Sequence, residues 1–430
     1  MNLLEFMDRS VSNFLATDTI TERLRGAGFT ELHEADHWEI TPGGRYYVVK
    51  NGTAVMAFIA GTDPTAGFGI IAAHSDSPGF RIKPRPAMQC GVNPVSGEPL
   101  MKLNTEVYGG AIWHTWFDRP LGLSGRVVLR SENPVYEPEH RTVRLDEPRL
   151  VIPHLAIHFN RQVNSELHLS AQKDMLPVLG YVSNALGGYD VVRTLVARKL
   201  NVEPDRILDF DLTLFDLQPA MTVGADSSWV NSGRLDDLAM AWCALEAITT
   251  AEPGIRTKVM AVFDNEETGS GTKQGAHSPL LRTILRRVVR ALGGDSEAMQ
   301  RSVARSFFIS ADCAHAAHPN YMEKMDPVNH PMLGGGPVVK VNANCKYMTD
   351  ADSAAAFKWI CSEAGVPCQE FVNHSDSPGG STLGNILTSQ LPMRGVDMGI
   401  GLWAMHSVRE TASLTDVDYT IRAFSKFYSL

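Results

Sequence analysis

Two adjacent glutamates, Glu266 and Glu267, stand just after an apolar run that has the length of a strand, residues 259–263. Gly269 and Gly271 follow them and loosen the backbone. This order is typical of an α/β sheet that delivers catalytic groups at its carboxyl edge. Neighbouring side chains on an extended segment point in different directions, so one glutamate can bind a metal while the other transfers protons. An isolated pair is more often an ordinary solvated strand end, so the interpretation depends on the rest of the chain.

Four further potential metal ligands follow apolar segments elsewhere: His74, Asp236, Asp312 and His406. Taken alone, His74 is more often a structural histidine, and Asp236 at a predicted helix start is as often a capping residue. Together with Glu267 they supply two imidazoles and three carboxylates. That set suits Zn²⁺, Mn²⁺ or Co²⁺.

A bridging role for Asp236 would give each of two ions one histidine, one further carboxylate and the bridge. Two ions about 3.5–4 Å apart can activate a water and polarise a carbonyl together. Glu266 would then accept the water proton and return it to a leaving amine. Asp76, two residues after His74, can accept a hydrogen bond from the other ring nitrogen and fix the tautomer.

The predicted elements place these residues on an α/β framework. Helices are expected over 2–27, 190–200, 235–248, 278–292, 351–364 and 416–428, and strands at 46–50, 54–60, 67–73, 259–263, 307–310 and 336–342. The stretch from 87 to 217 changes to short alternating runs separated by Pro and Gly, which indicates β structure. We therefore predict a mixed central sheet flanked by helices, formed by 1–86 and 218–430, with a β-rich domain inserted at 87–217.

Three other features lie outside this ligand set. His154 and His158 are four residues apart, which on a helix would place them on one face, but no HExxH glutamate accompanies them, so a structural role is the default. Lys340 interrupts an apolar strand, as an edge position or as a buried charge with a purpose. The turn containing Gly380 and Ser381 offers backbone N–H groups to a carboxylate or oxyanion.

The composition narrows the class of protein. Of 430 residues, 44% are hydrophobic and 20% are charged, a composition typical of a globular protein. The net charge of −9 gives no support for nucleic-acid or anionic-membrane binding. No apolar run reaches about 18 residues, so no membrane span is expected. The six cysteines form no CxxC pair, which favours a reducing compartment, and we predict a cytoplasmic location.

The motifs AAHSDSP, SGRLDD, FDNEETGS, ISADCAHAAHPNY, GPVVKVN and AMHSVRE together resemble the aspartyl aminopeptidase family nearly end to end. Members of that family are zinc- or cobalt-dependent exopeptidases with dinuclear metal sites. The resemblance implies an inserted domain that builds dimers, which assemble into a tetrahedral dodecamer. It also implies the five metal ligands named above, a bridging Asp236, Glu266 as general base and Asp76 behind His74.

The resemblance assigns roles to two more residues. It implies that His158 reaches a neighbouring subunit's active site, against its structural default, and that Lys340 faces the first side chain of the substrate. A lysine there would favour Asp or Glu. The family's more usual HTDSP is HSDSP here, and Gly379 stands where a cysteine often follows the proline. These departures affect substrate preference more than chemistry.

Three alternatives remain open. A broader aminopeptidase, or a deacylase or carboxypeptidase of the same clan, would share the metal site. A non-catalytic assembly protein would be expected to have lost the base or a ligand, yet all are present. A nucleotide-binding enzyme would need a GxGxxG or P-loop motif, and the chain has neither.

Overall fold

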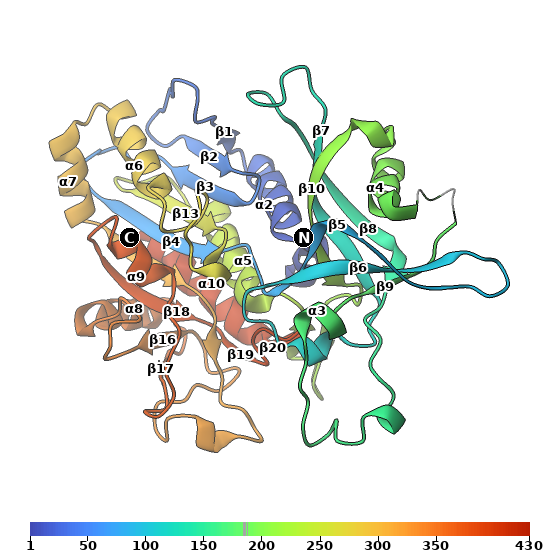
Figure 1. The fold of residues 1–430 in the computed structure, drawn as a ribbon. Helices are drawn as coiled ribbons and strands as arrows, with labels where there is room; N and C mark the ends of the chain where they lie inside the picture. Colours follow the sequence, from blue (N-terminus) through green and yellow to red (C-terminus); the bar gives the residue numbers. More distant parts are fainter. Residues whose placement is uncertain (184–185, 187) are drawn as a thin grey trace. The chain divides into compact units, whose positions relative to one another are not determined.

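A computed structural model describes residues 1–183, 186 and 188–430, which form two compact units (Figure 1). The first unit contains residues 1–76, 220–405 and 410–430, and the second contains 77–219 and 406–409. The chain therefore leaves the first unit directly after Asp76, and it visits the second unit again for four residues that begin with His406.

The first unit is built on a mixed nine-stranded sheet, in the order β1-β2-β3-β13-β4-β14-β18-β16-β17. Strands β13, β4, β14 and β18 run parallel, so their carboxyl ends share one edge. The strands are β1 (Thr30–Glu31), β2 (Arg45–Lys50), β3 (Ala54–Ile59), β4 (Phe68–His74), β13 (Thr257–Phe263), β14 (Phe307–Ala311), β16 (Val338–Val341), β17 (Gln369–Val372) and β18 (Arg394–Gly399). The predicted mixed sheet is confirmed.

Helices cover both faces of this sheet (Figure 1). One face packs against α1 (Leu3–Arg9), α2 (Asn13–Gly26), α5 (Leu235–Thr250), α8 (Ala351–Glu363) and α10 (Leu414–Ser429). The other face packs against α6 (Leu280–Ala291), α7 (Ser296–Ala304) and α9 (Leu383–Thr388). Strands β13 and β3 are buried along their whole length, as expected for strands covered on both sides.

A smaller five-stranded sheet completes the first unit, in the order β11-β12-β20-β19-β15. Its strands are β11 (Met221–Val223), β12 (Trp229–Ser232), β15 (Ala314–His315), β19 (Gly401–Trp403) and β20 (Glu410–Ser413). Short 3-10 turns, η6 (Glu266–Thr268) and η7 (Met322–Lys324), lie in the connections.

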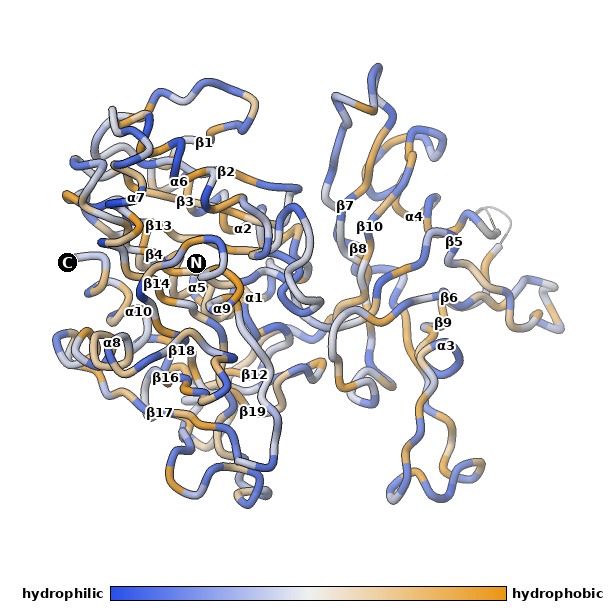
Figure 2. Tube along the Cα trace, turned by 60° about the vertical axis from the view of Figure 1, so that its left-hand side comes forward, coloured by the Kyte–Doolittle hydropathy of each residue, from blue (hydrophilic) through white to orange (hydrophobic). Residues whose placement is uncertain are grey.

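The second unit is a six-stranded antiparallel sheet in the order β8-β7-β10-β5-β6-β9. Figure 2 shows hydrophobic stretches along β7, β8 and β10. The strands are β5 (Gly79–Val92), β6 (Pro99–Tyr108), β7 (Leu121–Leu129), β8 (Glu139–Leu150), β9 (Val178–Tyr181) and β10 (Ile207–Asp216). The helices are α3 (Ala171–Asp174) and α4 (Val191–Leu200), with 3-10 turns η1 (Trp113–Trp116), η2 (Ile157–Phe159), η4 (Gly188–Asp190) and η5 (Pro204–Arg206). The β-rich character predicted for this stretch is therefore present.

Two local predictions were wrong. The single helix expected over 2–27 is two helices, because the Ser12 side chain accepts a hydrogen bond from Leu15 N–H and caps a new helix start. The helix face expected for His154 and His158 does not form. His158 lies in the short turn η2, and His154 precedes it outside any helix. Among the described helices, none is long and apolar enough to cross a membrane.

Candidate metal centre

His74 is the last residue of β4, and its side chain is only 1% exposed. Its Nδ1 atom lies 2.9 Å from the backbone carbonyl oxygen of Asp76 and 3.4 Å from that residue's carboxylate Oδ1. Its Nε2 atom lies 3.7 Å from Oδ1 of Asp236. The closer contact fixes Nδ1 as the donor, so the carbonyl of Asp76 holds the tautomer that leaves Nε2 as the ligand atom.

Asp236 and Asp237 lie at the start of α5 with non-helical backbone angles. Asp236 N–H donates to Oε2 of Glu410 at 3.0 Å. The Asp237 carboxylate accepts from the backbone N–H groups of His74 at 3.0 Å and Cys313 at 3.2 Å. Asp237 therefore links the carboxyl ends of β4 and β14, while Asp236 stands beside the imidazole.

Glu266 and Glu267 form the turn η6 after β13, which the left-handed Asn265 (φ 61°) introduces. Both backbone N–H groups donate to the Asp76 carboxylate, each at 3.1 Å. The Asp76 carboxylate therefore holds the glutamate turn in addition to lying 3.4 Å from Nδ1 of His74. This fixes the direction in which the two glutamate side chains leave the backbone.

Asp312 follows β14 and makes a buried ion pair with Lys340 of β16, with 3.1 Å between Nζ and Oδ1. The same ammonium donates to the carbonyl of Cys313 at 3.2 Å and lies 5.3 Å from the centre of the Tyr347 ring. Strand β16 has a neighbour on each side, so Lys340 is not at an edge. Of the two sequence interpretations, the buried charge is correct.

Two groups in the first unit have the spacing of metal ligands. One ligand atom each from His74, Glu266 and Asp312 lie within 4.8 Å of one another, and so do atoms from His74, Asp236 and Asp237. All belong to the carboxyl edge of the parallel strands or to the start of α5. The donors are imidazole nitrogen and carboxylate oxygen, the set expected for zinc.

The electrostatics of the cluster also fit a cation. Burial lowers the pKa of His74, but Asp237, Asp76 and Glu266 outweigh it and hold that pKa well above its usual value. Burial, opposed by His74 and reinforced by Asp312 and other carboxylates, raises the pKa of Glu266 from 4.5 to about 8. Carboxylates that crowd enough to retain protons near neutral pH would ionise beside a divalent cation.

The other predicted site residues are not members of these two groups. His406 is the first residue of the segment that belongs to the second unit, one peptide bond after Met405. His158 is exposed on the second unit. Gly380 and Ser381 are exposed in the turn before α9.

Two buried carboxylates were missed from the sequence as site residues. Asp237 was seen only as half of a capping pair. Asp397, in β18, accepts from Thr382 Oγ1 at 2.5 Å and from Met348 N–H at 2.6 Å, so it anchors the turn that carries Ser381. A lone acid among the apolar residues after Arg394 in the strand RGVDMG was the available signal.

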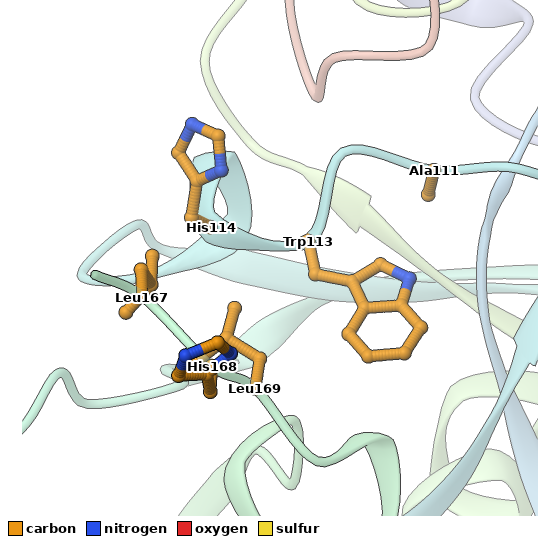
Figure 3. A pocket seen from close by; sticks show the side chains of 6 residues that line it. All are labelled: Ala111, Trp113, His114, Leu167, His168 and Leu169. Atoms are coloured by element: carbon orange, nitrogen blue, oxygen red, sulfur yellow. The ribbon is translucent and has the colours of Figure 1, made fainter. Parts of the chain in front are cut away.

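A separate hollow of about 410 Å³ lies in the second unit, where His114 and Trp113 of η1 stand opposite residues 167–169 (Figure 3). None of the predicted site residues is among those that line it. The hollow therefore gives no support to the metal-site assignment.

Comparison with known proteins supplies the family. Residues 6–428 match the profile described as aminopeptidase I zinc metalloprotease (M18). A relative from Clostridium novyi, named probable M18 family aminopeptidase 2, is 45% identical over 430 residues, covering 100% of this chain and 98% of the relative. A probable aspartyl aminopeptidase from Ricinus communis is 35% identical over 471 residues, covering 99% and 94%.

Solved structures agree with the relatives. A structure described as the Ape4 and Nbr1 complex is similar with a TM-score of 0.92 and 36% identity, covering 99% of this chain and 84% of that one. The mApe1 dodecamer of S. cerevisiae is similar with a TM-score of 0.84 and 25% identity, covering 99% and 95%.

Proposed function

Because the chain belongs to the M18 family of zinc metalloproteases and is thus a metal-dependent aminopeptidase, we propose that it releases N-terminal Asp or Glu from peptides. One observation carries the proposal: the buried cluster of His74, Glu266 and Asp312, with Lys340 paired to Asp312. The proposal assigns hydrolysis to this cluster and the preference for acidic residues to the fixed positive charge of Lys340.

We propose that His74, Asp236, Glu267, Asp312 and His406 hold two divalent cations, with Asp236 between them and zinc as the occupant. The ions would supply Lewis-acid activation of water and of the scissile carbonyl. Cobalt and manganese accept the same donors, so the choice among the metals depends on availability.

Glu266 is proposed as the general base. Burial and neighbouring carboxylates raise its pKa to about 8 without metal, and bound cations would lower that pKa, so that an ionised Glu266 can accept a proton from water and return it to the leaving amine. Asp76 positions it by binding the backbone N–H of Glu266. Asp237 in turn supports the backbone of His74 and of Cys313, the residue after Asp312.

Lys340 is the proposed source of the acidic preference. Its ammonium group is buried, and a carboxylate of the substrate placed near it would be attracted in a medium of low dielectric constant. The relative named as a probable aspartyl aminopeptidase supports this preference. Gly380 and Ser381 are proposed substrate contacts.

His158 is proposed to act in the site of a neighbouring subunit. The exposed side chains of Leu155 (56%), Ile157 (51%) and Phe159 (79%) surround it on the second unit, as expected for a segment that a second copy covers. The homologous dodecamer supports a homo-oligomer, and we propose dimers that assemble into a dodecamer. A cytoplasmic location remains a prediction.

A second candidate is an aminopeptidase of broad specificity. It is favoured by the observation that the Lys340 ammonium already binds Asp312 and the carbonyl of Cys313. In that case Lys340 would stabilise the Asp312 carboxylate and would not bind the first side chain of the substrate. Most of the similar relatives carry the general name M18 family aminopeptidase.

The replacement Glu266→Gln tests the mechanism. We expect kcat to fall by roughly 100- to 10,000-fold, because an amide cannot accept the proton from water. Metal content, measured by atomic emission, should persist. The exposed Glu297→Gln on α7 serves as the matched control and should behave like the parent. Full activity in the Glu266 variant would reject this residue as the base.

Substrate preference is tested separately. Chelated protein should be inactive towards Asp-, Glu-, Leu- and Lys-amide substrates, and zinc, cobalt or manganese should each be added back. Recovery that favours Asp and Glu supports the first candidate. Equal recovery for Leu supports the second.

A further inference from the structure

A cavity of about 270 Å³ lies in the first unit at the opposite edge of the central sheet from His74. It is lined by residues at the beginnings of strands, among them Phe68 of β4, Lys258 of β13 and Phe307 of β14. The same strands carry metal-centre residues at or just beyond their other ends. The cavity is therefore a separate site that the aminopeptidase chemistry does not use.

Four residues form its floor, in one row across four strands. Lys258 is aligned with Gly69, Gly69 with Phe307, and Phe307 with Arg394. Residues aligned in this way point to the same face of the sheet. Because Gly69 has no side chain, an aromatic ring from α10 approaches the row between the stem of Lys258 and the ring of Phe307.

Apolar and aromatic groups form the rest of the wall. A Cβ atom at Gly69 would lie 3.4 Å from the ring of Phe427 on α10, and the rings of Phe427 and Phe307 meet edge to face with 6.0 Å between their centres. Trp359 of α8 also lines the cavity, yet its side chain is 51% exposed. A half-exposed tryptophan at the mouth is available to a flat apolar ligand.

The cavity is strongly cationic. Arg256, Arg305, Arg394 and Lys258 line it, and none of the described lining residues carries an acidic side chain. Some of their donors are engaged. Arg394 pairs with Asp352 at 2.6 Å, and Arg305 donates to the carbonyl of Thr65 at 3.2 Å. Arg256 donates to the main-chain oxygen of Leu430 at 3.5 Å, and Lys258 donates to the carbonyl of Glu252. A guanidinium group has five donors, so each arginine retains capacity for an anion. This concentration of positive charge contrasts with the chain's net charge of −9.

We propose that this cavity binds a small amphiphilic carboxylate, an aromatic ring on a short alkyl chain that ends in a carboxylate. The ring would lie against the aromatic wall formed by Phe307, Phe427 and Trp359, and the carboxylate would meet the arginines, which bind this group in a bidentate manner. The volume lies just below the range of about 300–1,000 Å³ for drug-sized ligands, so the ligand is small. Free amino acids fit poorly, because their ammonium group would be repelled.

The test is isothermal titration of the chelated, full-length protein with 4-phenylbutyrate, so that a carboxylate cannot bind at a metal. We expect one saturable site per chain. The uncharged 4-phenylbutanol should bind at least about ten-fold more weakly, and 4-phenylbutylamine should not bind. Equal affinity for the alcohol would overturn the proposal, as would equal displacement of the acid by inorganic phosphate, which has no apolar body.

Variants locate the site. Trp359→Ala and Arg305→Gln should each weaken binding by roughly three- to ten-fold, and Gly69→Val should abolish it, because the added side chain would push the Phe427 ring into the cavity. Arg282→Gln on α6, an exposed arginine outside the cavity, should leave affinity unchanged. If Gly69→Val does not fold, the Trp359 and Arg305 variants decide the outcome. Unchanged affinity in both would exclude this cavity as the site.

Discussion

The carboxylate of Asp76 accepts a hydrogen bond from the backbone N–H of Glu266, 3.1 Å away, although the two residues are 190 positions apart in the chain. Its second oxygen accepts from Glu267 N–H at the same distance. Asp76 is only 2% exposed. Asp76, just after β4, thereby sets the position of both glutamates just after β13.

Asp76→Asn is expected to lower activity without removing any proposed ligand. An amide offers only one acceptor oxygen, so one glutamate N–H loses its partner and the turn becomes less fixed. We expect activity or metal affinity to fall by about 10- to 100-fold. Steady-state kinetics and metal titration measure both. The control is Asp63→Asn, because Asp63 is exposed and accepts only within its own loop, from Thr65. Equal kinetics in the two variants would contradict the positioning role.

Asp237→Ala should mainly affect stability. The carboxylate is fully buried and accepts from His74 and Cys313, so its removal leaves two buried N–H groups without partners. Each such group costs about 1–3 kcal/mol, so the free energy of unfolding should fall by roughly 2–6 kcal/mol. Denaturant unfolding of chelated protein measures this without the contribution of bound metal. A loss below about 1 kcal/mol would show that the two hydrogen bonds matter little.

The sequence predicted most of the fold because the apolar runs were strong. The strands ending near His74, Glu266 and Asp312, and the helix α5, all form close to their predicted bounds. The sequence could not predict which groups the polar side chains would bind. The two backbone N–H groups that Asp76 binds in addition to lying beside the His74 imidazole depend on how two strands are aligned, and that alignment comes from packing.

The same limit explains the other differences. Asp236 and Asp237 are chemically alike and adjacent, so only the structure separates the carboxylate beside the imidazole from the one that binds backbone. The four-residue spacing of His154 and His158 would place them on one face of a helix, but the same spacing is compatible with the irregular segment that forms. Lys340 was ambiguous until the order of the strands was known.

Lys340→Met separates the two functions considered for this lysine. If the ammonium attracts the substrate's acidic side chain, kcat/KM for an Asp substrate should fall by roughly ten-fold or more relative to a Leu substrate. If it only neutralises Asp312, both substrates should lose activity in the same proportion. The measurement is the Asp/Leu ratio of kcat/KM. Lys358→Met, at an exposed lysine on α8, controls for loss of charge.

The final prediction concerns Asp416 at the start of α10, which accepts from Gly336 N–H at 2.7 Å and Gly334 N–H at 2.8 Å. Burial, only partly offset by these two hydrogen bonds, raises its pKa from 3.8 to about 6. The folded protein therefore binds this proton more tightly than the unfolded chain. Asp416 stabilises the fold most below pH 4, and that contribution is lost as the pH rises to about 6. The free energy of unfolding of the parent minus that of Asp416→Asn should fall by on the order of 2 kcal/mol between pH 4.5 and 7. Denaturant unfolding at a series of pH values gives this difference, in which the other titrating groups cancel. A difference that is constant or rises with pH would mean that Asp416 is already ionised in the folded protein at pH 4.5.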